Sequence, residues 1–285
     1  MNAALAAWNR YWFTPETAER FALMRVVTYG LLFMIYLPLD DRGWTQVSPV
    51  FWMPISVFHF LPGPPRNAMV IGILQILWKI SLFTSAIGIV SRWSMVTAAA
   101  LGVFLLGLPN CFGKIHHIDG FPVLLMIVLA FPGSAGRWRV RLGQTLFLLL
   151  FFAAGFAKLR NGGLAWMTAS NMRSIWLGEL FTHTPPTRLG SILSGSTWLP
   201  QFAAVATVVI ELSALPAVFV RCLRVCTLLG IFCMQVFIAL MLGVYFTPHL
   251  AGYALFLPRF HGFRRKTVHP GNSRSVIGTK PAKAP

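Results

Sequence analysis

Long apolar runs separated by short arginine-rich connections are the feature that most constrains the fold of this chain. A helix needs about 20 apolar residues to cross the hydrocarbon core of a bilayer. Eight runs come close to that length: Phe21–Leu39, Met69–Val90, Met95–Leu108, Ile118–Phe131, Val140–Ala157, Gln201–Val220, Val225–Phe246 and the shorter Leu250–Leu257. Lipid offers the backbone no hydrogen-bond partners, so such runs form helices. The sequence therefore predicts an all-α, polytopic transmembrane bundle with six to eight spans, and eight is preferred.

Composition supports an integral membrane protein and disfavours other classes. Apolar residues make up 56% of the 285 residues and charged residues only 11%, a balance that is unusual for a water-soluble chain of this length. The net charge is +17, but Lys and Arg lie between apolar runs rather than in a basic groove, so no nucleic-acid partner is expected. The four cysteines lie in or beside apolar segments and predict neither a disulfide framework nor a metal knuckle.

The arginines also indicate an orientation. With eight spans and a cytoplasmic N-terminus, the tight arginine-rich turns all fall on the cytoplasmic side, as the positive-inside rule requires. The longer connections 40–68, 109–119 and 158–200 fall on the other side. We therefore expect a multi-pass protein of the plasma (inner) membrane with both termini in the cytoplasm.

The chain is expected to contain one domain flanked by two cytoplasmic segments. Residues 1–20 form the N-terminal segment, residues 21–258 the transmembrane domain, and residues 259–285 a basic tail without apolar periodicity that is expected to be disordered. Two interfacial helices are predicted in the outer connections, at Pro49–Gly63 and Thr168–Phe181.

Charged residues inside the apolar runs are candidate functional residues, because a charge in hydrocarbon is costly. Arg25 could simply snorkel to the headgroups or pair with Glu19. Lys79 lies midway in its run and could belong to a structural ion pair or to a site. Glu211 is the only acid deep in a run, so it should find a cation or take up a proton. Lys79 and Arg25 are its candidate partners.

A second set of polar residues lies at the predicted outer ends of the fourth and fifth spans. The stretch GKIHHIDGF contains His116 and His117, but adjacent histidines do not project to one side of a helix, so it is a weak metal motif. Lys158 and Arg160 are expected at the same depth, which would allow an acid–base constellation.

Lys158 has two interpretations. It follows the small residues Ala153–Gly155, which let another helix approach closely and would shield the amine from water. Desolvation favours the neutral amine and would suit a base. The alternative is a lysine that only snorkels to the interface.

The segments RFALMRVVTYG, KIHHIDGFPVLLMIVLAF, FFAAGFAKLRNGGLAWM and IELSALP resemble the HTTM family. That family includes the membrane part of vitamin K-dependent gamma-carboxylase and many bacterial proteins. The resemblance covers about Arg10 to Arg259. It implies that a lysine deprotonates a hydroquinone, and the matching residue here is Lys158. It also implies that His117 bonds to the quinone oxygen and that Glu211 is the family's acidic residue.

This chain departs from the carboxylase pattern in three ways. It has no large soluble portion after the spans, its Asn-His pair reads His116–His117, and a histidine expected in the seventh span is replaced by apolar residues near Phe232. The resemblance therefore does not imply that peptide glutamate is the substrate of this chain.

Two main hypotheses follow. In the first, the protein is a quinol-dependent modifying enzyme or oxidoreductase with an outward-facing cavity. Its catalytic residues would be Lys158, His117 and Glu211, with His116, Lys79 and Arg160 binding a reduced, vitamin K-like quinone and no metal. In the second, it is a non-catalytic membrane subunit that binds or matures an exported peptide or a redox protein. Membrane lipid is a partner in both. A transporter is less favoured, because no repeated half is found.

Overall fold

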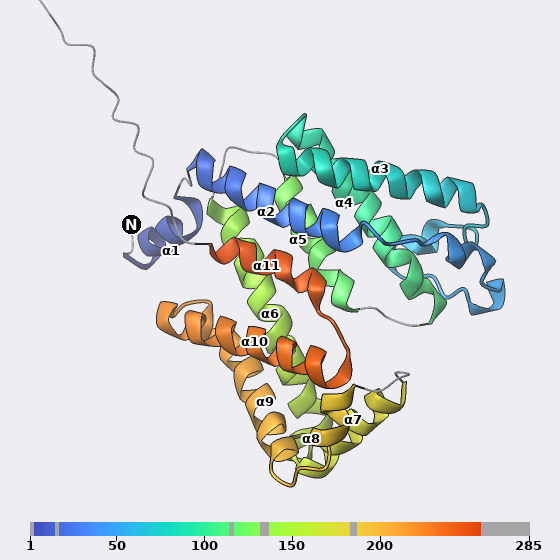
Figure 1. The fold of residues 1–285 in the computed structure, drawn as a ribbon. Helices are drawn as coiled ribbons and strands as arrows, with labels where there is room; N and C mark the ends of the chain where they lie inside the picture. The colour runs from blue at the N-terminus through green and yellow to red at the C-terminus, as the bar shows by residue number, and fades with distance from the viewer. Residues whose placement is uncertain (1–2, 15–16, 114–116, 132–136, 183–186, 258–285) are drawn as a thin grey trace, which may run out of the picture.

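The computed structural model describes residues 3–14, 17–113, 117–131, 137–182 and 187–257, and this part of the chain contains α-helices and 3₁₀ turns but no strand (Figure 1). The eleven α-helices of these residues are α1 (Ala3–Phe13), α2 (Ala18–Tyr36), α3 (Ala68–Ile87), α4 (Ser91–Gly107), α5 (Gly120–Ala130), α6 (Arg137–Gly162), α7 (Ala169–Thr182), α8 (Arg188–Leu193), α9 (Leu199–Ala217), α10 (Arg221–Leu242) and α11 (Leu250–Tyr253). The predicted all-α class is confirmed.

Within the described residues, five helical segments are long and apolar enough to cross a membrane. They are Ala68–Ile87, Arg92–Phe112, Arg137–Met167, Leu199–Ala217 and Arg221–Leu242. Each coincides with one of the predicted spans to within a few residues, apart from Arg137–Met167, which continues beyond the predicted end at Ala157. The finding supports a multi-pass membrane protein.

The other three predicted spans take shorter or more polar forms. Helix α2 has 19 residues but carries several charged residues, and α5 has only 11 residues, a length of about 16 Å. The last run forms the short helix α11 between two 3₁₀ turns, Thr247–His249 and Ala254–Phe256, and it packs among α2, α5 and α6, with Ala251 and Leu255 fully buried. A full count of eight spans therefore stays a prediction.

Helix ends follow the local sequence. The side chain of Asn67 accepts hydrogen bonds from the Met69 and Val70 amides at the start of α3, as an N-cap residue does. Gly88 ends the same helix at φ 86°, the left-handed conformation that glycine adopts without strain. The guanidinium of Arg25 lies against Gly88 so closely that a Cβ there would clash with it. Arg25 therefore packs on the end of α3 and is not the partner of Glu211.

The helices form two packed groups that share α6. Helices α2, α3, α4 and α5 pack in sequence order around one large apolar core that includes Trp78 and Phe121. Helices α7, α9 and α10 form a smaller cluster around Met172 and Trp176. In Figure 1, α6 runs from the first group to the second, and it packs on α9 and α5.

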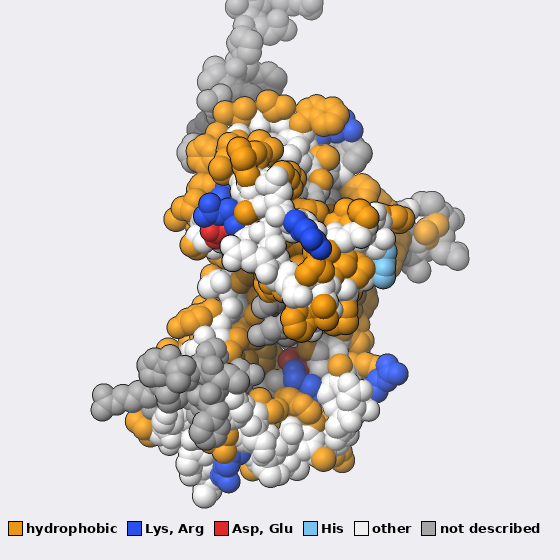
Figure 2. Space-filling view, turned by 90° about the vertical axis from the view of Figure 1, so that its right-hand side faces the viewer, with side chains coloured by type: hydrophobic (Ala, Val, Ile, Leu, Met, Phe, Trp, Pro, Cys, Tyr) orange, Lys and Arg blue, Asp and Glu red, His pale blue; other side chains and the backbone are white. Residues whose placement is uncertain are grey.

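The outer surface of the bundle is largely apolar. Figure 2 shows hydrophobic side chains over much of one face, with charged side chains at separate points. Large apolar residues remain exposed on the candidate spans, among them Met69, Phe202 and Leu229. Lipid contact accounts for this exposure in a membrane protein.

The two predicted interfacial helices have different outcomes. The segment Thr168–Phe181 forms α7, as expected. The segment Pro49–Gly63 instead contains two short 3₁₀ turns, Pro49–Phe51 and Ser56–Phe60, because prolines interrupt it. The predicted tail at residues 259–285 lies outside the described residues.

Candidate functional site

An ion pair between α6 and α9 is the centre of the candidate site. The Lys158 ammonium donates hydrogen bonds to both carboxylate oxygens of Glu211, at 2.5 Å to Oε1 and 2.6 Å to Oε2. The Glu211 side chain is 5% exposed and the Lys158 side chain 24%. The expectation that Glu211 finds a cation is confirmed, but the cation is Lys158 rather than Lys79 or Arg25.

A glycine in α6 allows the two helices to approach at the level of this pair. A Cβ added to Gly155 would lie 2.7 Å from Glu211 Cβ and 3.3 Å from Glu211 Oε2 and Leu212 N. Any side chain at this position would therefore push α9 away from α6. The small-residue patch predicted before Lys158 does bring another helix close, and that helix carries the acid.

The ion pair borders a cavity of about 270 Å³ between α6, α7, α9 and α10. The polar residues that line this ion-pair cavity are Lys158, Thr207, Glu211, Gln235 and His249. Its aromatic residues are Phe151, Trp166, Trp176, Phe237 and Phe246. A mostly apolar cavity with a few converging polar groups is typical of a site for a small hydrophobic ligand.

The stretch AKLRNGGLAW folds back so that both of its ends reach the cavity. Helix α6 ends at Gly162, Gly163 takes a φ of 56°, and a 3₁₀ turn over Gly163–Met167 follows. The turn places the Trp166 ring centroid 5.1 Å from Lys158 Nζ, within the range of a cation–π contact. Lys158 is therefore held by both the acid of α9 and the indole of its own segment.

A histidine that sequence reasoning missed, His249, also lines the cavity. His249 is 3% exposed and its Nδ1 lies 3.0 Å from Gln235 Nε2. The hydroxyl of Tyr253 donates to Gln235 Oε1 at 3.2 Å. With Gln235 Nε2 as the donor, Nδ1 accepts and the neutral imidazole carries its proton on Nε2. The signal in the sequence was a glutamine in the middle of a candidate span and a histidine between two apolar runs.

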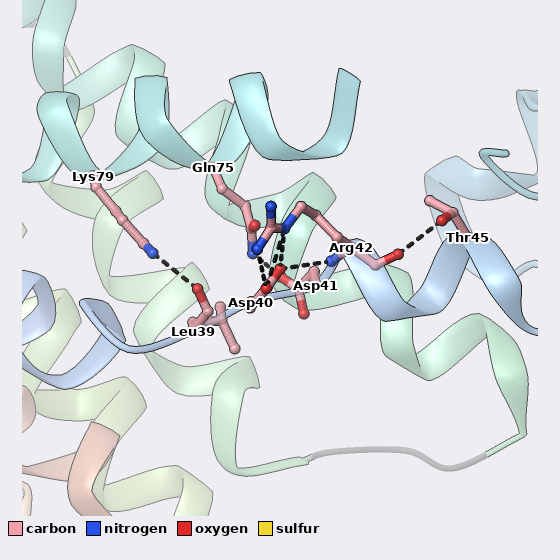
Figure 3. A network of polar contacts seen from close by, with 7 residues as sticks. All are labelled: Leu39, Asp40, Asp41, Arg42, Thr45, Gln75 and Lys79. Carbon is pink, nitrogen blue, oxygen red and sulfur yellow. Dashed lines mark hydrogen bonds and ion pairs between the residues drawn. The ribbon is translucent and has the colours of Figure 1, made fainter. Parts of the chain in front are cut away.

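The other predicted site residues do not line this cavity. Lys79 donates to the backbone carbonyl of Leu39 at 2.8 Å (Figure 3) and belongs to the other helix group. Arg160 is exposed on the surface of α6 and is not part of the cavity lining. Both placements correct the expectation that these cations share a site with Lys158.

The predicted histidine pair is only partly described. His116 lies outside the described residues, and for His117 the backbone alone is described, in the 3₁₀ turn His117–Asp119. That turn packs against the turn Thr247–His249. The chain at His117 is therefore near the cavity wall that carries His249.

A second buried carboxylate lies in the first helix group, just after α2. Asp41 is 2% exposed and accepts a hydrogen bond of 3.2 Å from Gln75 Nε2 of α3 (Figure 3). Burial raises the pKa of Asp41 to about 6, and hydrogen bonds from Gln75 and Trp44 counteract part of that rise. Its neighbour Asp40 is exposed and paired with Arg42, whose hydrogen bonds lower the Asp40 pKa to about 2.

Neither region resembles a metal centre. In the described part of the chain, no three His, Cys, Asp or Glu side chains are grouped so that they could hold a metal ion.

No protein-family model matches the chain, and no curated protein or solved structure matches it either. The resemblance to the HTTM family therefore stays a prediction, and the site is interpreted from its own geometry.

Proposed function

We propose that this membrane protein is an enzyme of the HTTM type that deprotonates a reduced quinone in the ion-pair cavity. The observation that carries the proposal is the Lys158–Glu211 pair, which presents an exchangeable proton and a carboxylate to an apolar cavity. Membrane proteins rarely place such charges between helices without a functional reason.

The residues present suit a reduced quinone. A flat aromatic ring fits a cavity of about 270 Å³ lined by Trp166, Trp176 and Phe237, and aromatic walls favour stacked or edge contacts with such a ring. The ring hydroxyls need polar partners inside the apolar wall. Lys158 and His249 lie in the lining and can serve as those partners.

The pair can act as a two-step proton acceptor. Lys158 passes one proton to Glu211 along their short hydrogen bond, and the free amine then accepts a proton from a ring hydroxyl. The pair ends with one net positive charge beside the deprotonated oxygen, which that charge stabilises. When bound, the reduced quinone would supply two electrons and, in total, its two hydroxyl protons to molecular oxygen, which gives quinone and hydrogen peroxide.

The remaining residues orient the ring and exclude water. Trp166 covers Lys158 from the side of the α6 segment. The imidazole of His249 can donate a hydrogen bond to the distal ring oxygen when Gln235 bonds to its Nδ1. His117 stays a candidate for that role through the family resemblance.

The test supplies reduced menaquinone and oxygen to the purified full-length protein and follows quinone formation and oxygen uptake. Wild type is expected to turn over. Lys158→Ala should lose at least about a hundredfold in rate, the usual worth of a general base. Arg160→Ala is the matched control, since it removes a cation two residues away that does not line the cavity.

A non-catalytic binding or maturation subunit is the competing function. It would bind quinone or a peptide partner equally well in wild type and Lys158→Ala, and neither protein would oxidise the quinol. Folded wild-type protein that neither binds nor oxidises reduced menaquinone would rule out the proposed chemistry.

We also propose the finer topology for this enzyme. It has eight membrane segments with both termini in the cytoplasm of a plasma (inner) membrane, so that the ion-pair cavity faces outward. The arginine-rich helix ends support this orientation.

A further inference from the structure

A second cavity, of about 640 Å³, lies at the end of the bundle where α6 begins. Its lining includes five arginines: Arg20, Arg137, Arg141, Arg221 and Arg224. None of the described residues that line this arginine cavity is acidic. Seventeen residues of α6 separate Arg141 from Lys158, a distance of about 26 Å along the helix. The arginine cavity is therefore separate from the ion-pair cavity.

Helix directions add to the positive potential of the arginine cavity. Helices α2, α6 and α10 begin at Ala18, Arg137 and Arg221, and each contributes an arginine to the lining from its first turns. The amino-terminal end of a helix carries a partial positive charge. Three such ends beside five guanidinium groups favour an anion.

Several of these arginines are positioned by neutral acceptors of the protein. Arg224 donates to the carbonyls of Ala217 and Val218 at the end of α9, at 2.9 and 2.5 Å. Arg141 donates to Gln144 Oε1 at 3.0 Å. A guanidinium has five N–H donors, so these contacts leave further donors on both side chains. The backbone contacts hold the guanidinium groups without neutralising them.

Apolar side chains line the same cavity. Phe219 and Val225 belong to the lining and are 71% and 54% exposed, and Leu228 lies one turn further along α10. A soluble anion would gain nothing from such residues. A ligand with a phosphate and an acyl chain would contact both the arginines and the apolar wall.

We propose that the arginine cavity binds the phosphate of an anionic phospholipid, with the guanidinium groups on the headgroup and the α10 residues on the acyl chain. Basic pockets between membrane helices on the cytoplasmic side bind lipids of this kind. Arginine suits the role because its planar fork bonds two phosphate oxygens at once. The site is independent of the proposed enzymatic function.

The experiment titrates the full-length protein in detergent with phosphatidylglycerol and counts bound lipid by native mass spectrometry. The test variant is Arg141→Gln/Arg221→Gln. Each arginine contributes about fivefold to binding, so the double variant should bind roughly thirtyfold more weakly. Arg92→Gln is the matched control: it removes an arginine from the first turn of α4 that does not line the cavity, and it should bind like wild type.

Two further measurements distinguish binding of an anionic phospholipid from binding of a neutral phospholipid or of free phosphate. Phosphatidylcholine, which has the phosphate but no net charge, should bind at least about tenfold more weakly to wild type. Inorganic phosphate at the same concentration should not displace phosphatidylglycerol. Complete displacement would overturn the lipid assignment.

Equal phosphatidylglycerol binding by wild type and the double variant would overturn the site itself. If the double variant does not fold, Arg221→Gln alone replaces it, because Arg221 is exposed at the rim. That single variant should bind phosphatidylglycerol roughly fivefold more weakly than wild type.

Discussion

Among the described residues, each of the two helix groups buries one carboxylate, and the two groups satisfy it in different ways. In the first group, Asp41 accepts a hydrogen bond from the neutral amide of Gln75 within a well-packed core. In the second group, Glu211 accepts two hydrogen bonds from the charged Lys158 beside a cavity. Hydrogen bonds from neutral partners offset only part of the cost of burying a charge, so the Asp41 carboxyl holds its proton to a higher pH.

This difference in partners and surroundings indicates a structural role for Asp41 and a candidate functional role for Glu211. The Asp41–Gln75 contact ties the connection after α2 to α3, and neither residue lines the ion-pair cavity or the arginine cavity. The Lys158–Glu211 pair faces a space that a ligand can enter. A buried ion pair adds little net stability compared with apolar residues of the same volume, which favours a functional reason for keeping it.

The largest effect is expected from breaking the ion pair on one side. Lys158→Met leaves Glu211 buried without a cation and should lower the free energy of unfolding by about 3 kcal/mol. Lys158→Met/Glu211→Leu should recover most of the loss. Thermal unfolding of the purified variants measures both. Gln75→Leu is the comparison in the other group and should cost about 1 kcal/mol. Equal losses in the free energy of unfolding for Lys158→Met and Gln75→Leu would show that the two buried carboxylates depend on their partners to the same extent.

A smaller effect is expected where α6 and α9 touch. Gly155→Ala places a methyl group against Glu211 and should destabilise the protein by about 2 kcal/mol, with loss of quinol oxidation. Gly30→Ala in α2 is the control, because a Cβ there meets nothing within 4 Å. It should be neutral or slightly stabilising, as alanine is favoured in a helix. Unfolding temperatures and turnover are measured for both, and an unaffected Gly155→Ala would contradict the close approach.

Acid titration should distinguish Asp41 from its neighbour Asp40. The folded-state pKa of Asp41, about 6, lies above its ordinary value of 3.8. The folded protein therefore binds this proton more tightly, and the Asp41 contribution to stability is lost as the pH rises from about 4 to about 6. Asp41→Asn should remove that loss. Asp40, with a pKa near 2, contributes stability above pH 4 that disappears as the pH falls further.

Unfolding temperatures of wild type, Asp41→Asn and Asp40→Asn between pH 3 and 7 check this pair of predictions. Asp40→Asn should leave the loss between pH 4 and 6 unchanged. A wild-type and Asp41→Asn difference that does not vary with pH would show that folding does not raise the pKa of Asp41.

The smallest effect is expected at Lys79. Its ammonium donates one hydrogen bond to the Leu39 carbonyl, so Lys79→Met should cost about 1 kcal/mol of stability and leave quinol oxidation unchanged. Unfolding and turnover of the same preparation test this. A loss of turnover without a loss of stability would indicate that Lys79 takes part in the reaction, as predicted from the sequence.

Much of the helical framework followed from local sequence. Apolar runs predicted the five candidate spans, and the AAG patch predicted a close helix approach ahead of Lys158. Polar residues inside apolar runs drew attention to Glu211 and Lys158, and these two do meet. The prediction of Glu211 and Lys158 succeeded because burying a charged side chain in the hydrocarbon of the bilayer costs free energy.

The pairing of residues far apart in the chain was not predictable in the same way. Lys79 and Arg25 were the predicted candidate partners for Glu211, but the structure pairs it with Lys158; all three are cations in or at the end of an apolar run, so local sequence does not distinguish them. His249 was overlooked because a single histidine between apolar segments has no local pattern. Only the contacts of His249 with Phe151 of α6 and Gln235 of α10 gave it a role in the cavity lining.

The sequence by itself determined that the chain forms apolar helices, that arginines gather in the short connections before several of these helices, and that a few charges must be buried. These properties depend on local hydrophobicity and helix length. The tertiary structure decided which helices touch, and so which acid meets which base. It placed Glu211 against Lys158 because Gly155 lets α9 approach α6, a contact between residues more than fifty positions apart that no local pattern encodes.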